Sequence, residues 1–96
     1  MAYDPGAIDA TLAAAVGDEP GLIAELRLAF IESIERSLAA LAAADDDGAW
    51  RIAALRMKGI SASFGAVRLM ALASEAETRP LDPDILAKLT RSIARL

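Results

Sequence analysis

Apolar residues recur every three or four positions along most of this 96-residue chain, which places them on one face of an α-helix. The longest such stripe consists of Ile23, Leu26, Phe30, Ile34, Leu38 and Leu41. Much of the 55% hydrophobic share is alanine, the residue with the highest helix propensity. The β-branched and aromatic residues that favour strands are sparse. We therefore predict an all-α fold.

Helix starts are marked where an acidic residue precedes proline, because the acid can cap the first turn and proline fits the first helical position. These pairs predict a short helix from Asp4-Pro5 to Val16, a long one opening at Asp18-Glu19-Pro20, and a last one opening at Asp82-Pro83. The later residues of Asp45-Asp46-Asp47 should cap a helix that starts near Gly48 or Ala49. Gly65 marks a turn before a helix from Ala66, which Arg79-Pro80 ends.

The predicted inward residues of the last three helices follow from the same spacing. They are Trp50, Ala53, Ala54, Met57, Ser61 and Phe64, then Leu69, Met70, Leu72, Ala73 and Ala76, then Ile85, Leu86, Leu89, Ile93 and Leu96. Four helices with short connections pack most simply as an antiparallel up-down four-helix bundle, with the short extra N-terminal helix covering one end. This length suits one core, so we expect a single domain over residues 1–96.

Composition excludes several functions. A net charge of −4 argues against nucleic-acid binding. The chain contains no histidine or cysteine, and the run of aspartates lacks calcium-loop spacing, so we expect no metal and no cofactor. The longest apolar run, 38–44, is far below the ~20 residues that span a bilayer. With no signal-peptide pattern either, we expect no membrane association and a cytoplasmic location.

The acidic balance hides an asymmetry. Residues 1–47 contain ten acids and two bases, whereas residues 48–74 contain four bases and no acid. These bases are Arg51, Arg56, Lys58 and Arg68. This basic segment is either a chance feature of a short window or a surface for an acidic partner.

One face of the third helix is predicted to be exposed to solvent but has an unusual residue composition for an exposed face. At about 100° per residue, Leu55 lies about 140° from the inward Trp50. Instead of charged or amide side chains, the face around Leu55 carries Ile52, Gly59 and Ala62. We call these four residues the exposed apolar face, and Arg51, Arg56 and Lys58 its basic rim.

Gly59 is informative because glycine inside a helix costs about 1 kcal/mol relative to alanine. It lies four residues after Leu55, on the same outward side, so it leaves the Leu55 side chain uncovered. It is either a tolerated glycine or a position kept open for a partner.

Residues 53–66 read Ala-Ala-Leu-Arg-Met-Lys-Gly-Ile-Ser-Ala-Ser-Phe-Gly-Ala. This segment resembles the signature of histidine-phosphotransfer (Hpt) domains, roughly His-x-Leu-Lys-Gly-Ser-x-x-x-x-Gly-Ala. Lys58-Gly59 and Gly65-Ala66 carry the match. It extends to Ala76-Glu77, where the family typically has Leu-Glu, and to the helix start at 47–50. It covers about thirty residues in motif and the whole chain in helix count.

The decisive departure is Leu55, which stands where the resemblance places the phosphorylated histidine. Leucine has no lone pair to accept a phosphoryl group. Ser61 falls on the buried side of the helix and Ser63 away from Leu55, and serine forms a stable ester rather than a transferable phosphoramidate. We therefore predict that the chain is not an enzyme.

The resemblance implies a phosphorelay protein without transfer activity, which docks a response-regulator receiver domain or a histidine kinase. The expected contact residues are Arg51, Ile52, Leu55, Arg56, Lys58, Gly59, Ala62 and Arg68. Two alternatives stay open. One is a phosphotransfer protein whose histidine was substituted, and the other is a helical interaction protein unrelated to phosphorelays.

Overall fold

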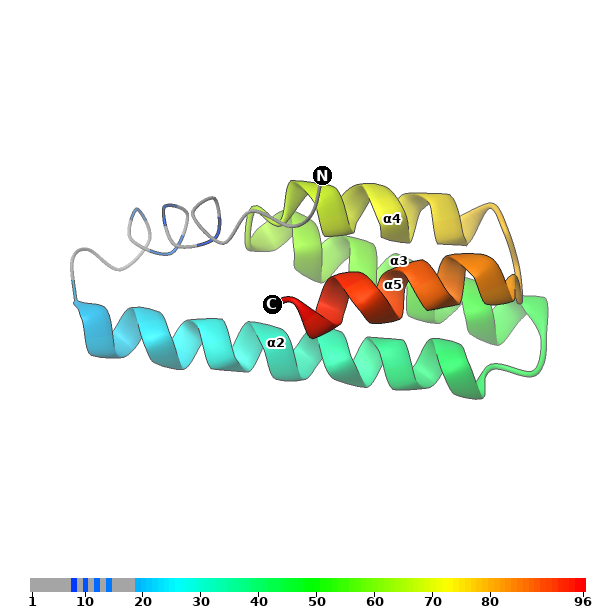
Figure 1. Cartoon of the computed structure of the whole chain (residues 1–96), viewed down its shortest axis with the longest axis horizontal. Coiled ribbons are helices and arrows are strands. Elements are labelled where there is room, and N and C mark those ends of the chain that lie inside the picture. The colour runs from blue at the N-terminus through cyan, green and yellow to red at the C-terminus, as the bar shows by residue number, and fades with distance from the viewer. Residues whose placement is uncertain (1–7, 9, 11, 13, 15–18) are drawn as a thin grey trace.

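A computed structural model of the chain describes residues 8, 10, 12, 14 and 19–96. Its helices over the continuous part are α2 (Pro20–Ala43), α3 (Asp47–Ser63), α4 (Val67–Glu77) and α5 (Pro83–Ala94). Successive helices run in opposite directions, and each packs against two neighbours, with α5 closing the ring onto α2 (Figure 1). The predicted all-α, up-down four-helix bundle is confirmed.

Aspartate caps set two of the helix starts. The Ala49 backbone N–H donates to Asp46 Oδ1 at 2.7 Å, so α3 begins at Asp47, slightly before the predicted start. At α5, Asp82 accepts from the Asp84 N–H at 2.8 Å and Pro83 follows it, as predicted. α2 differs, because its N-cap Glu19 makes no side-chain capping bond, and proline alone matches the expected chemistry there.

The predicted N-terminal helix lies largely outside the described residues, and so does its Asp4-Pro5 start. Ile8 and Leu12, two residues of its expected stripe, are described as helical. Both are buried in the common hydrophobic core.

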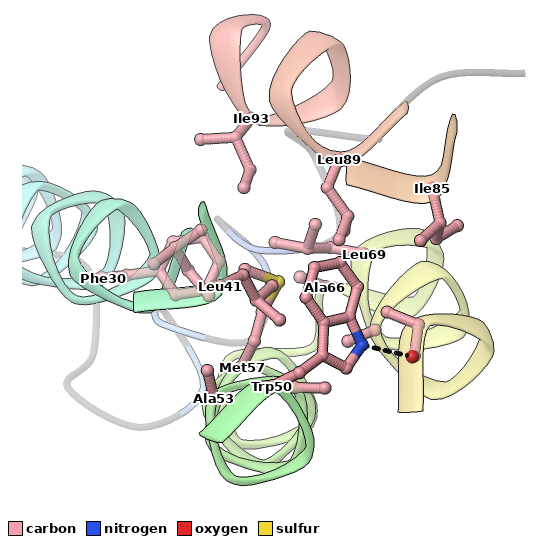
Figure 2. Packing of buried hydrophobic residues seen from close by; sticks show 14 of the residues in the cluster. Phe30, Leu41, Trp50, Ala53, Met57, Ala66, Leu69, Ile85, Leu89 and Ile93 are labelled. Carbon is pink, nitrogen blue, oxygen red and sulfur yellow. Dashed lines mark hydrogen bonds between the residues drawn. The ribbon is translucent and has the colours of Figure 1, made fainter. Parts of the chain in front are cut away.

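The core is built around Trp50, a residue that is 2% exposed and whose indole points toward side chains of α4 and α5 (Figure 2). Its Nε1–H donates to the Ala76 carbonyl at 2.7 Å, which satisfies the one polar atom of the ring. Phe30 and Met57 are buried, as predicted. Phe64 faces the core as predicted, but it is the C-cap of α3 and only half-buried, with its ring centroid 4.9 Å from that of Phe30.

The turn between α3 and α4 depends on Gly65, which has a φ of 72° that side chains with a Cβ rarely adopt. The Ala66 N–H then donates a hydrogen bond to the Ser61 carbonyl at 2.9 Å. Ala66 is the N-cap of α4, so that helix begins one residue after the predicted start. This tight turn lays α4 along α3.

Candidate functional site

The buried side of α3 fixes which residues form its exposed apolar face. Trp50, Ala54 and Met57 are buried, so the positions rotated away from them meet solvent. Leu55 is 42% exposed and Ile52 is 62% exposed, so two large aliphatic side chains of α3 meet solvent on one face. The predicted exposure of Leu55 is confirmed.

Gly59 and Ala62 form the low part of this face. Both are exposed, and a Cβ built on Gly59 would have no neighbouring atom within 4 Å. No close packing inside the bundle therefore requires glycine at this position. The Ser63 hydroxyl donates to the Gly59 carbonyl at 3.0 Å, a local bond that points its oxygen back along the helix. A partner could approach the backbone here more closely than on an ordinary helix surface.

An acidic residue from outside residues 48–74 lies next to two members of the basic rim. Glu77 of α4 lies beside α3, with Oε2 3.8 Å from Arg51 Nε and Oε1 3.7 Å from Lys58 Nζ. Arg51 and Lys58 stand one turn before and one turn after Leu55, so the carboxylate between them lies alongside Leu55. The basic segment of the sequence is thus partly neutralised in the fold. The signal that could have found Glu77 is its place in the Ala76-Glu77 part of the motif.

The other predicted contact residues are not gathered in the same place. Arg56 is exposed on α3, one turn from Ile52 and on the opposite edge of the face from Lys58. Arg68 is exposed on α4, nine residues before Glu77, which places it on the side of α4 opposite Glu77. Neither Arg56 nor Arg68 makes an ion pair within residues 19–96. The structure does not bring Arg68 to the exposed apolar face.

A hydrogen bond in the core fixes the position of α3 relative to α4 at this surface. Trp50 of α3 is bonded to the Ala76 carbonyl, and Glu77 is the next residue of α4. The same contact therefore fixes the level at which the Glu77 carboxylate meets α3. Rotation or sliding of α3 against α4 would break this buried hydrogen bond, so the bond opposes such a movement.

The described residues offer little other reactive chemistry. Ser61 is fully buried and its hydroxyl has no hydrogen-bond partner among them, so it is not presented to a phosphoryl donor. The described acids are nowhere grouped so that they could hold a metal ion. None of the helices α2–α5 is long and apolar enough to cross a membrane.

Fold and motif together define a small helical-bundle module of the phosphotransfer type. The family model of the Hpt domain matches residues 20–96, which is most of the chain, and the chain belongs to the Hpt domain family. Membership places it in phosphorelay-type signalling, in which Hpt domains interact with response regulators and kinases. No curated protein and no solved structure matches the chain.

Proposed function

We propose that this chain is a non-transferring Hpt module of the cytoplasm that docks a receiver domain or a histidine kinase. The observation that carries the proposal is the exposed Leu55, which stands at the motif position of the phosphorylated histidine. The chain has no histidine elsewhere to take over that role. An exposed leucine flanked by Ile52 and an open Gly59 offers apolar contact where the family offers a nucleophile.

The surface supports docking on two physical grounds. Ile52 and Leu55 would lose water-exposed apolar area on contact with a partner, which is worth roughly 25 cal/mol per Å² removed from water. Arg51 and Lys58 carry positive charge beside them and would meet an acidic receiver rim. The apolar centre with a charged border is the usual arrangement of a protein–protein interface.

The test is a binding experiment with purified receiver domains and kinase domains from the organism that encodes the chain. At least one should bind the native chain, and Lys58→Glu should weaken that complex roughly tenfold because a rim attraction becomes a repulsion. Lys88→Glu on the exposed surface of α5 is the matched control and should change binding little. Equal losses in both variants would show general electrostatics and contradict the proposed site.

A second function, a phosphotransfer protein with a substituted histidine, is favoured by the retained Lys58-Gly59 spacing. Leu55→His should leave the fold unchanged, since exposed substitutions stay within about ±0.5 kcal/mol. If the surroundings still suit transfer, the variant should take phosphate from a phosphorylated receiver, with an acid-labile and alkali-stable label. Receiver binding without transfer supports the docking module instead. Neither binding nor transfer across the whole set would contradict both functions.

A further inference from the structure

Glu77 contacts both cations that flank Leu55. The two distances, 3.8 Å to Arg51 and 3.7 Å to Lys58, are ion-pair distances but are too long for hydrogen bonds. The Glu77 side chain is only 22% exposed, whereas those of Arg51 and Lys58 are 66% and 41% exposed. The carboxylate thus sits at the base of the rim, and the cations remain open to an incoming group.

The position of Glu77 in its own helix is unfavourable. Glu77 is the last residue of α4, and the last turn of α4 contains no basic residue. The carbonyl end of a helix carries partial negative charge, so a carboxylate there is disfavoured. Attraction to two cations from α3 offsets this, and α4 itself provides no compensation of the kind.

We propose that Glu77 is an internal competitor for Arg51 and Lys58, and that it restricts the site to partner surfaces with clustered carboxylates. The inference rests on the proposed function, because it concerns the same rim. Two cations and one carboxylate leave a single net positive charge beside Leu55. A single carboxylate of the partner is attracted only weakly by this one net charge. A cluster of carboxylates, in contrast, can replace Glu77 beside both Arg51 and Lys58. Glu77 is therefore a specificity-determining residue that does not itself attract the partner.

The test uses Glu77→Gln, which removes the charge and keeps the shape. The matched control is Glu75→Gln, which makes the same charge change on the same helix. Glu75 lies two residues away on another side of α4 and pairs with Arg79 at 2.7 Å, away from the rim. The first probe is a ten-residue polyglutamate peptide, whose binding to the full chain is measured at low salt and at about 0.15 M ionic strength.

Glu77→Gln should bind the peptide about two- to fivefold more tightly than the native chain, since surface ion pairs have this order of strength. Glu75→Gln should stay close to native. The gain should shrink when Lys58→Gln is added, because Arg51 is then the one cation of the pair left for the peptide. Equal gains in Glu77→Gln and Glu75→Gln, or weaker binding by Glu77→Gln, would overturn the proposal.

The second probe is any receiver domain that binds the native chain. The same order of affinities is expected, with a steeper loss of binding on adding salt for Glu77→Gln. If no receiver domain and no histidine kinase domain binds any variant, the proposed function fails, while the peptide result still decides the role of Glu77. If a receiver binds and Lys58→Glu weakens it, but Glu77→Gln gives no gain with either probe, only the role of Glu77 fails.

Discussion

Replacement of Ser61 by alanine should stabilise the protein. The Ser61 side chain is fully buried in α3, and its hydroxyl has no hydrogen-bond partner within the described chain. A buried polar group without a partner costs about 1–3 kcal/mol in lost hydration. Alanine is also a better helix former than serine by about 0.5 kcal/mol. The substitution therefore removes a cost and leaves the helix backbone unchanged.

The magnitude follows from these terms. The oxygen also makes a few dispersion contacts, each worth about 0.1–0.2 kcal/mol, which alanine would lose. The net gain is then about 1–2 kcal/mol. For a domain of this size, each kcal/mol raises Tm by roughly 4–8 °C.

The assay is urea unfolding followed by circular dichroism, with thermal unfolding as a second measurement. Ser63→Ala is the matched control, because it is the same substitution two residues away at an exposed position. It loses only the local bond to the Gly59 carbonyl and should stay within about ±0.5 kcal/mol. Ser37→Ala in α2 should share the sign of Ser61→Ala, since that hydroxyl is also buried without a partner in the described part. A loss of stability in Ser61→Ala would show that its hydroxyl is satisfied, for instance by a buried water, and would refute the argument.

Three further predictions concern stability. Leu81→Gly should be more stable than Leu81→Ala by about 0.5–1 kcal/mol in urea unfolding, because both variants lose the leucine side chain and only glycine adopts the φ of 58° without strain. Equal stabilities of the two variants would contradict this prediction. Trp50→Phe should lower the free energy of unfolding by about 1–3 kcal/mol, because it leaves a cavity and removes the donor to the Ala76 carbonyl. In urea unfolding this appears as a lower midpoint with an unchanged m-value. A neutral result would mean that the indole does not anchor α3. The Asp84 N–H and then Arg79 lower the pKa of Asp82, so its contribution is complete above the ordinary aspartate pKa of about 3.9 and is lost as the pH falls through the lower folded value. Asp82→Asn should therefore flatten the acid limb of the stability–pH curve, and an unchanged limb would count against this assignment.

The sequence predicted the helices well because their ends depend on local chemistry. An aspartate cap or a proline needs only the next few residues to act, so Asp46, Pro20 and Asp82 mark starts that the structure confirms within a residue or two. Phe64 packs against the core as predicted, although it is the C-cap of α3 and not one of its helical residues. It caps the helix because Gly65 turns the chain directly after it. The angular positions of side chains around one helix do not predict where that turn occurs.

The candidate site also has a part that could be predicted from one helix and a part that depends on how two helices pack. Leu55, Ile52 and Gly59 share one helix, so a rotation of about 100° per residue was enough to predict that they lie together in solvent. Glu77 and Arg68 belong to another helix. Their positions relative to Leu55 depend on how α4 is rotated against α3, which no spacing within one helix determines.

The sequence by itself determined the helical bundle, the exposed apolar face and the absence of a histidine to phosphorylate. Only the tertiary structure decided the charge of that face. The buried bond from Trp50 to the Ala76 carbonyl sets the register of α3 against α4 and brings Glu77 between Arg51 and Lys58. The same rotation of α4 turns Arg68 away. Charge counted along a chain sums residues that are near in sequence, whereas a partner meets those that packing has brought near in space.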